Sequence, residues 1–494
     1  MLNIEETKCG NFFFIFVVGL TTTIILSGSY LPLIDLPQHA AQVATLDDLL
    51  KGQSIWSGLV ELNFNTPYLI GYLSWLGLMQ FSDIVVSSRI LVALIFLLFI
   101  FSSILLKNTL HTSWLVPWIA IPSFFGFCYE WGFLTYLLAI SIGIIFFVQN
   151  IKWSKKPNLK QCIMVIILGV LLFYSHILSY LFFCLLSFVF VFYNLESKKN
   201  ILKILPIYFI FFCLIIFYLK QGDSLSAQYT YGVKVMYHSI GEKIMYLFIY
   251  PWSMLNKSLM YISLILLCIP LLMGYVFSKK IEKYIPLVVF IFIWFALPHF
   301  MSNTYFIYER YSILFFIFYF SVFEKQHNFQ YSRYASYIFL VLINYLMLED
   351  YKNIFLAKKE TSDFATIVEK LPDNQRVLGL MFEPSSMSVS TPFTYVHFGS
   401  WYQAQKNGWS DFNFAWFHPQ IVRYKPDTVP EVKPGFEWAP QNVQLLKNCQ
   451  NYNLLIIRAY DQSVKNIVQN SLCHDYTLML NEGTWFVFSK ITNS

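Results

Sequence analysis

The chain has 494 residues, of which 57% are hydrophobic and 13% are charged, and its mean hydropathy is +0.54. Soluble globular domains carry about 25% charged residues, so this composition excludes a soluble protein and indicates a polytopic membrane protein. The net charge of +6 comes from lysine-rich loops between apolar runs, and it does not indicate a nucleic-acid partner.

The first apolar run, 12–30, carries no charge and is long enough to cross a hydrocarbon core of about 30 Å. Glu5 and Glu6 precede this run, and no small-residue cleavage site follows it. We therefore expect a retained helix and not a signal peptide, with Asp35 emerging at the membrane surface.

The segment Asp35-Leu-Pro-Gln-His39 places a carboxylate and an imidazole just after this helix. A membrane enzyme that needs a general base would put a carboxylate here. Alternatively, Asp35 is the N-cap of an interfacial helix over 40–50, with Pro37 in its first turn. The two interpretations are compatible. In a helix, His39 would share a face with Asp35 and would either orient the carboxylate or contact an acceptor.

Twelve apolar runs are candidate membrane spans. They are 12–30, 66–81, 90–106, 114–126, 132–149, 161–175, 177–194, 204–219, 258–278, 285–298, 311–323 and 335–348. The run 66–81 contains Pro67 and several polar residues, so we expect it to lie in the interface or to re-enter. Without this run, every lysine cluster between spans falls on the cytoplasmic side, as the positive-inside rule requires. We predict eleven spans plus interfacial helices.

Eleven spans put four loops on the outer face of the membrane: 31–89, 126–131, 220–257 and 298–310. The 126–131 turn holds Glu130, and the 298–310 loop holds His299, Glu309 and Arg310. His176 lies at an outer helix junction. Because charged groups near membrane depth are functional candidates by default, their gathering on one side indicates a functional face.

After Asp350 the Phe and Leu runs stop, and Pro, Asn, Gln and Trp become more frequent. The expected elements are two buried strands, an amphipathic helix and a hairpin: 376–382, 452–458, 462–472 and 476–490. We therefore predict a transmembrane domain over 1–350 and a small extramembrane α/β domain over 351–494.

The C-terminal region also contains an aromatic segment and two cysteines outside apolar runs. The segment from His397 to His418 is rich in Trp, Tyr and His, which suits either packing onto the membrane domain or stacking on sugars. Cys449 and Cys473 either form a disulfide, if this region is periplasmic, or remain free thiols. No CxxC pair, Gly-rich phosphate motif, HExxH motif or nucleophile elbow occurs in the sequence.

The order of these features resembles that of the GT-C glycosyltransferases, membrane enzymes that use polyprenyl-phosphate sugars. The shared features are a first helix, an outer loop that opens with an acidic residue, an interfacial Pro-Tyr segment, a helix that begins Ser88-Arg89-Ile90-Leu91, and a later outer Glu-Arg-Tyr. The resemblance covers approximately residues 10–350 and is clearest over 29–135. The most similar members are the dolichyl-phosphate-mannose-type protein mannosyltransferases and the aminoarabinose transferases of lipid A.

The resemblance implies roles for three residues. Asp35 matches the acidic residue of the first outer loop, Glu130 matches in position the acidic residue of the turn between the third and fourth helices, and Arg310 matches an arginine that contacts the donor phosphate. Asp35 is followed by Leu36, where the protein mannosyltransferases have an Asp-Glu pair. The resemblance therefore leaves the acceptor class open.

The chemistry of sugar transfer from a lipid phosphate requires residues of the same kinds. A base must take a proton from the acceptor hydroxyl, and a cation must stabilise the departing phosphate. Asp35 suits the first task, and the guanidinium of Arg310 suits the second. The further candidates are His299 beside the phosphate, and a cavity lined by His176, Glu309 and Arg89.

The sequence thus predicts a glycosyltransferase of a bacterial inner membrane, with a periplasmic C-terminal domain, a polyprenyl-phosphate-linked donor, and a glycan, lipid or protein acceptor. A divalent metal ion at Asp35 with His39 is compatible with the residues, although no spacing demands one. The alternatives are a transporter or flippase of lipid-linked sugars and a non-catalytic envelope assembly protein. A transporter would favour charges at mid-membrane depth and an internal repeat, and a simple anchor does not need eleven spans.

Overall fold

The protein is described by a computed structural model, which covers residues 8–194, 201–222, 235–325, 332–446, 449–460 and 475–491. The helix expected over 462–472 and Cys473 lie outside these residues. Cys449 is disulfide-bonded. The chain forms two compact units. The described residues within 1–25, 92–222 and 235–351 form the first unit, and those within 26–91 and 352–491 form the second.

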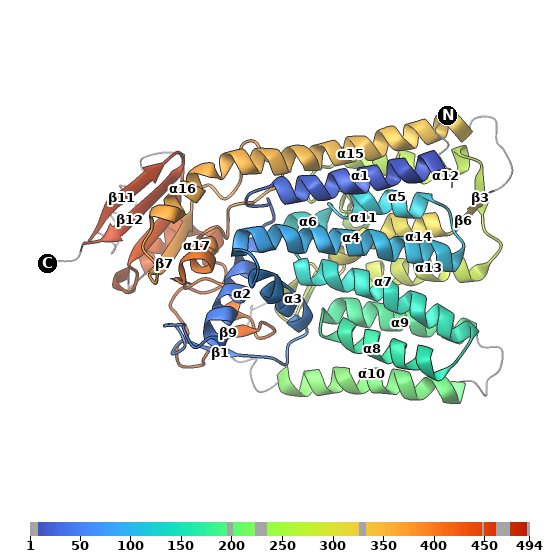
Figure 1. The fold of residues 1–494 in the computed structure, drawn as a ribbon, viewed down its shortest axis with the longest axis horizontal. Helices are drawn as coiled ribbons and strands as arrows, with labels where there is room; N and C mark the ends of the chain where they lie inside the picture. The colour runs from blue at the N-terminus through green and yellow to red at the C-terminus, as the bar shows by residue number, and fades with distance from the viewer. Residues whose placement is uncertain are drawn as a thin grey trace. The chain divides into compact units, whose positions relative to one another are not determined.

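Helices build the first unit (Figure 1). They are α5 (Leu115–Ser123), α6 (Phe127–Trp131), α7 (Leu134–Lys155), α8 (Leu159–Phe173), α9 (Ile177–Tyr193), α10 (Ile201–Gly222), α11 (Ile240–Ile249), α12 (Leu259–Leu272), α13 (Ile285–Ala296) and α14 (Phe315–Ser321). Three long helices have residues in both units: α1 (Lys8–Ser27), α4 (Ile84–Leu110) and α15 (Ser332–Glu360).

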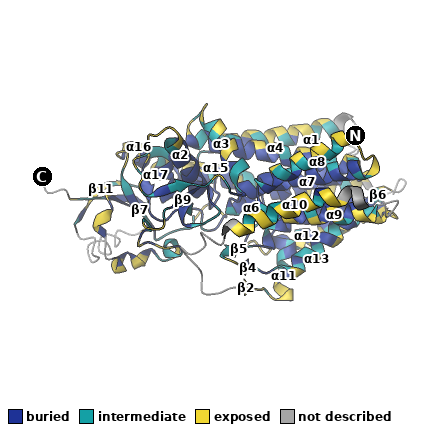
Figure 2. Cartoon of the chain, turned by 90° about the horizontal axis from the view of Figure 1, so that it is seen from below, coloured by how far each residue is buried: buried dark blue, intermediate teal, exposed yellow. Residues whose placement is uncertain are grey.

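Apolar composition makes several of these helices suitable for a membrane. Among the described residues, three helical segments are long and apolar enough to cross one: Gly10–Ser27, Ile84–Leu110 and Leu134–Lys155. The shorter apolar helical segments are Leu69–Met79, Leu159–Phe173, Ile177–Tyr193, Leu205–Lys220 and Leu259–Leu272. Helix α10 exposes large apolar side chains along its length, as a helix against hydrocarbon would (Figure 2). The count of eleven spans stays a prediction.

Three segments that the sequence predicts on the outer face contact one another in the first unit. The backbone N–H of Phe127 donates to the carbonyl of Tyr250 at 2.9 Å, and Cys128 Sγ donates to the carbonyl of Arg310 at 3.0 Å. Gly126 makes this approach possible, because a Cβ there would lie 2.4 Å from the carbonyl oxygen of Pro251. The loops 126–131, 235–257 and 298–310 therefore form one polar end of this unit.

A second group of loops meets around two short strands, β3 (Tyr275–Phe277) and β6 (Phe323–Lys325), which pair antiparallel. The ammonium of Lys283 lies 2.9 Å from the Glu324 carboxylate and donates to the carbonyl of His111 at 2.8 Å. Lys283 and Glu324 belong to loops that the sequence predicts on the cytoplasmic side, whereas β3 lies within the apolar run 258–278.

The second unit is built on a five-stranded sheet of order β11-β12-β10-β7-β8. Its strands are β7 (Arg376–Met381), β8 (Trp409–Ser410), β10 (Leu454–Arg458), β11 (Tyr476–Glu482) and β12 (Trp485–Lys490). The strands β8, β7 and β10 are parallel, and β12 runs antiparallel to β10 and β11. The two predicted strands and the hairpin are confirmed, and Gly483 adopts the positive φ of +56° that the hairpin turn needs.

Four helices accompany this sheet: α2 (Leu36–Leu50), α3 (Leu69–Met79), α16 (Ser362–Lys370) and α17 (Gly399–Lys406). A second, two-stranded sheet pairs β1 (Val60–Leu62) with β9 (Val422–Tyr424). This pairing and the packing of α2 against α17 place residues 26–91 with the C-terminal residues, whereas the sequence analysis groups 1–350 together. The eleven residues of α3 extend for about 16 Å, about half of the hydrocarbon thickness, which agrees with an interfacial or re-entrant helix.

Gly143 provides a test of the packing of α7 against α9. A Cβ at this position would lie 2.1 Å from Cδ2 of the buried Phe183 ring. We expect Gly143→Ala to lower the free energy of unfolding by about 1–3 kcal/mol through overpacking, measured as a lower Tm in detergent. Gly77→Ala is the matched control, since no described atom lies within 4 Å of a Cβ there. Equal melting of the two variants would contradict this packing.

Candidate functional site

Asp35 occupies the N-cap position of α2, as one sequence interpretation predicts, but its carboxylate does not cap the helix. An N-cap side chain accepts from the N–H of the second or third helical residue, and the second residue here is Pro37, which has no N–H. The backbone of Asp35 is also helical, with φ −89° and ψ −5°, where N-caps favour the β region. The buried carboxylate of Asp35 therefore does not bond to the start of α2, and it can contact another residue.

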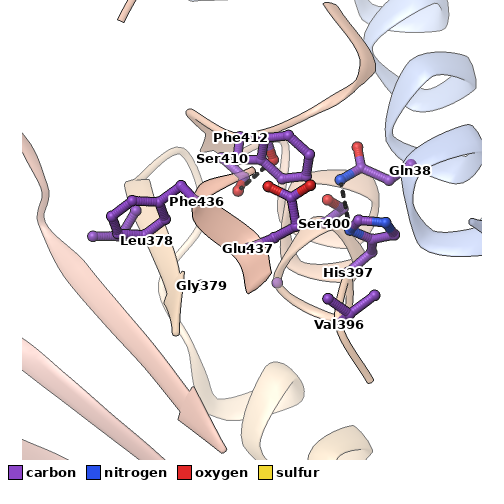
Figure 3. A pocket seen from close by; sticks show the side chains of 11 residues that line it. Gln38, Leu378, Gly379, Val396, His397, Ser400, Ser410, Phe412, Phe436 and Glu437 are labelled. Atoms are coloured by element: carbon purple, nitrogen blue, oxygen red, sulfur yellow. Dashed lines mark hydrogen bonds between the residues drawn. The ribbon is translucent and has the colours of Figure 1, made fainter. Parts of the chain in front are cut away.

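That contact is His397, whose Nε2 lies 3.4 Å from Asp35 Oδ1. Gln38 determines the tautomer of this histidine. The amide oxygen of Gln38 accepts the backbone N–H of Phe414 at 3.0 Å, so its amide nitrogen faces His397 Nδ1 at 3.4 Å and donates to it. A neutral His397 then carries its proton on Nε2 and presents it to Asp35. Two of these residues, Gln38 and His397, lie side by side in Figure 3.

A small, partly open pocket adjoins this pair (Figure 3). Its lining includes Gln38, His397, Glu437 and the aromatic rings of Phe412 and Phe436. Burial raises the pKa of the Glu437 carboxyl above its usual value; the charge of His397 opposes this shift, and that of Asp35 adds to it. The pocket therefore combines titratable groups with aromatic faces.

Two close glycines let the pocket form where α17 begins against β7. A Cβ on Gly379 would lie 3.3 Å from the Cα of Gly399. A Cβ on Gly399 would lie 3.1 Å from the Cα of Gly379, so a side chain at either position would crowd the start of α17, two residues after His397. The sequence thus positions His397 through the backbone as well as through Gln38.

His39 is in α2, one turn after Asp35, and its backbone N–H donates to the Asp35 carbonyl at 3.1 Å. Its Nδ1 lies 2.9 Å from the hydroxyl of Tyr72 in α3. Because this hydroxyl donates to the amide oxygen of Gln420, it accepts a hydrogen from His39. The imidazole of His39 is thus held by α3, and it is His397 that lies opposite the Asp35 carboxylate.

Arg89, expected in a cavity, binds backbone carbonyls instead. Its Nη1 donates to the carbonyl of Leu26 at 3.0 Å and to that of Gly28. Leu26 is in the last turn of α1 and Gly28 follows that helix, so Arg89 holds the chain where it leaves α1.

Glu130 is buried in the short helix α6 of the first unit. Its carboxylate accepts the backbone N–H of Met254 and the hydroxyl of Ser253, the latter at 3.3 Å. Burial raises the pKa of Glu130 to about 7, although these two hydrogen bonds lower it. A carboxyl with this pKa can exchange a proton near neutral pH.

Arg310 and His176 lie together at the same end of the first unit. Arg310 Nη1 is 3.2 Å from His176 Nε2, and the guanidinium lies 3.9 Å from the centroid of the Phe133 ring. His176 caps α9, because its Nδ1 accepts the backbone N–H of Leu178 at 3.2 Å. A neutral His176 therefore carries its proton on Nε2, beside the N–H groups of Arg310. Two donors side by side favour an anion that accepts from both.

His299 and Glu309 form a third group in this unit. His299 Nδ1 lies 2.5 Å from Glu309 Oε1, and the carboxylate of Glu309 is fully buried. The ring of His238 stacks beside His299, with centroids 4.2 Å apart. Glu309, which the sequence analysis places in the lining of a cavity, is thus paired with His299.

Sequence reasoning did not identify the partners of these residues. It named His397 only as part of an aromatic segment and Gln38 only as part of the segment from Asp35 to His39, and it did not name Glu437, His238 or Ser253. His397 precedes a Gly-Ser pair that begins α17, and this helix start beside a histidine is the one local signal that could have marked it.

No protein-family profile and no curated protein matches the chain in sequence. Solved structures do match the fold. Arabinofuranosyltransferase AftD from Mycobacteria matches with a TM-score of 0.54 and 11% identity over 100% of this chain, which spans 41% of the length of that protein. ArnT from Cupriavidus metallidurans, in the apo state, matches with a TM-score of 0.52 and 10% identity over 97% of this chain and 98% of its own. The chain therefore has a GT-C-like fold.

The pKa of Glu130 predicts how stability depends on pH. The folded pKa of about 7 exceeds the ordinary value of 4.5, so this group's contribution to stability is fully present below pH 4.5 and is lost as pH rises through 7. The loss amounts to about 3 kcal/mol. Glu130→Gln should therefore melt higher than wild type at pH 8.5, with a smaller difference at pH 5.5. A difference in Tm that does not depend on pH would contradict the raised pKa.

Proposed function

We propose that this chain is a membrane glycosyltransferase that transfers a sugar from a polyprenyl-phosphate-linked donor to a glycan, lipid or protein acceptor. In this proposal the chain lies in a bacterial inner membrane, the transfer takes place on the outer face, and residues 351–494 form a periplasmic domain. The observation that carries the proposal is the buried Asp35 carboxylate opposite His397, in a chain with a GT-C-like fold. One of its structural neighbours is an arabinofuranosyltransferase.

Asp35 is the proposed base. The acceptor hydroxyl loses its proton to this carboxylate as its oxygen bonds to the anomeric carbon of the donor sugar, and the bond from that carbon to the phosphate oxygen breaks. His397 supports the step, because its Nε2–H faces Asp35 Oδ1 and orients the carboxylate. Gln38 keeps this tautomer in place. His39 contributes through Tyr72 and the position of α3.

Arg310 and His176 are the proposed anion site for the donor phosphate. Their neighbouring N–H groups can donate to phosphate oxygens as negative charge develops on the leaving group. The two hydrogen bonds from Arg310 to the backbone of Phe306 and Tyr305 fix the plane of the guanidinium, so little reorganisation is needed during the reaction. His299 and Glu309 support Arg310 from the preceding turn.

The residues around the pocket beside His397 are the proposed contacts of the acceptor. Phe412 and Phe436 offer aromatic faces to the apolar side of a sugar ring, while Glu437 and Gln38 offer hydrogen-bond partners to hydroxyl groups. Glu130 is the second proposed acid–base group, since its pKa of about 7 suits proton exchange.

Asp35→Asn should lower the rate of donor consumption by about 10²–10⁴-fold, because the amide cannot accept the proton. The measurement is release of free polyprenyl phosphate from a panel of polyprenyl-phosphate sugars by the purified protein in nanodiscs. Asp48→Asn, on the same helix but partly exposed, is the matched control and should retain wild-type release. Movement of intact donor across the bilayer without release would instead indicate a transporter, and binding without either would indicate an assembly protein.

Arg310→Ala should reduce kcat/KM for the donor by about 100-fold or more, since the leaving phosphate loses a charged donor. Arg310→Lys should restore only part of the activity, because an ammonium cannot reproduce the fork of guanidinium N–H groups. Arg333→Ala serves as the control, since this arginine is exposed and its guanidinium contacts Tyr337, one turn along the same helix. Equal kcat/KM values for Arg310→Ala and Arg333→Ala would reject the phosphate role.

A further inference from the structure

Three segments of the first unit bring two histidines and a glutamate together. His238 follows β2 (Val235–Met236), His299 precedes β4 (Phe300–Met301), and Glu309 begins the 3-10 helix η3 (Glu309–Leu314). One ring nitrogen of each histidine and one oxygen of the carboxylate all lie within 4.8 Å of one another.

The backbone fixes this convergence. Strands β2 and β4 pair antiparallel, β4 pairs with β5 (Thr304–Tyr305), and the N–H of His299 donates to the carbonyl of Met236 at 2.8 Å. The N–H of Ile307 donates to the carbonyl of His299 at 3.2 Å, which holds the start of η3 beside the sheet. The three side chains therefore sit on a hydrogen-bonded frame and not on independent loops.

The carboxylate of Glu309 is incompletely satisfied. It is 0% exposed, Oε1 contacts His299, and Oε2 has no hydrogen-bond partner among the described residues. A buried carboxylate costs several kcal/mol unless its oxygens are paired. A cation with several positive charges near Oε1 and Oε2 would offset this cost better than one imidazole does.

The two imidazoles also favour a shared cation. Their planes are tilted by 31° with centroids 4.2 Å apart, so two charged rings would repel each other. The hydroxyl of the buried Tyr308 lies 2.7 Å from His238 Nδ1 and holds that ring beside Glu309, whose Oε1 is 3.5 Å from the same nitrogen. Neutral imidazoles oriented toward one point are the usual ligands of zinc.

The neighbouring charges are engaged elsewhere. Lys243 donates to the carbonyls of Trp294, Phe295 and Leu297, and Glu242 closes the capping box of α11 with Ser239. Neither the ammonium of Lys243 nor the carboxylate of Glu242 is therefore available to replace the histidines or the glutamate of the cluster.

We propose that His238, His299 and Glu309 bind a divalent transition-metal ion of the zinc class. Two histidines and one glutamate are a common zinc ligand set, with bonds of about 2.0–2.2 Å and a fourth position for water. The side chains of His238 and His299 are 24% and 12% exposed, which gives the ion and its water access. The metal would cross-link β2, β4 and η3, and it would hold Arg310, the next residue after Glu309. The site does not depend on the proposed function.

The test measures metal without any donor. Full-length protein without a polyhistidine tag is stripped with chelator in detergent, equilibrated with zinc in the presence of a competing chelator of known affinity, desalted and analysed by elemental mass spectrometry. We expect one zinc per chain in the wild type and at least a tenfold loss of affinity in His299→Ala. His111→Asn is the control and should bind zinc like the wild type, since His111 is exposed, lies elsewhere, and has a positive φ of +51° that asparagine tolerates.

A second variant and a second signal guard against misfolding. Glu309→Gln keeps the shape of the side chain but removes its charge, and cobalt in place of zinc gives visible absorption when its ligands are tetrahedral. Wild-type protein should show this absorption, and folded Glu309→Gln should lose it. A wild type that retains no zinc against the competing chelator, or variants that retain as much as the wild type, would overturn the proposal.

Discussion

The packing of α2 against α17 is the contact on which the second unit depends. Asp35 lies at the start of one helix and His397 just before the start of the other, so this packing alone places the carboxylate against the imidazole. It is possible because Gly379 and Gly399 let α17 approach β7 closely. The buried amide of Gln38 then adds direction, since its two ends bond to groups from two different segments. The close backbone packing and the hydrogen bonds of Gln38 therefore act together to place Asp35 against His397.

The first unit gathers its charged groups differently. Here His238, His299 and Arg310 lie in or beside the connections between apolar helices, where short strands, helix caps and one close glycine contact hold the loops together. The buried Glu130 is bonded to Ser253 and Met254, and the partly exposed Arg310 lies beside His176. Groups that are costly to bury are thus concentrated in one region, a pattern typical of functional sites.

Local sequence predicts the parts of the fold that local physics determines. The hydrophobic runs of β7 and β10, the Asn-Glu-Gly turn of the hairpin and the Pro-containing start of α2 each specify an element without help from distant residues.

The position of Asp35 was predictable from the sequence for the same reason. Its partner was not, because His397 is brought there by tertiary packing, and an isolated histidine in an aromatic segment carries no such signal. His238 was missed likewise, since only the pairing of β2 with β4 brings it to Glu309. The grouping of residues 26–91 with the C-terminal residues depends on the β1–β9 pairing, which no local pattern encodes.

The distance along the chain between paired residues has a consequence for biosynthesis. Gln38 and His397 are 359 residues apart, and Val60 pairs with Tyr424. At about 5–20 residues per second, the ribosome needs roughly 20–70 s to make the intervening chain. During that time the segment 26–91 lacks both its strand partner and its covering helix. The nascent protein therefore cannot assemble Asp35 with His397 until almost all of it has been translated, and a truncated product would not contain the pair.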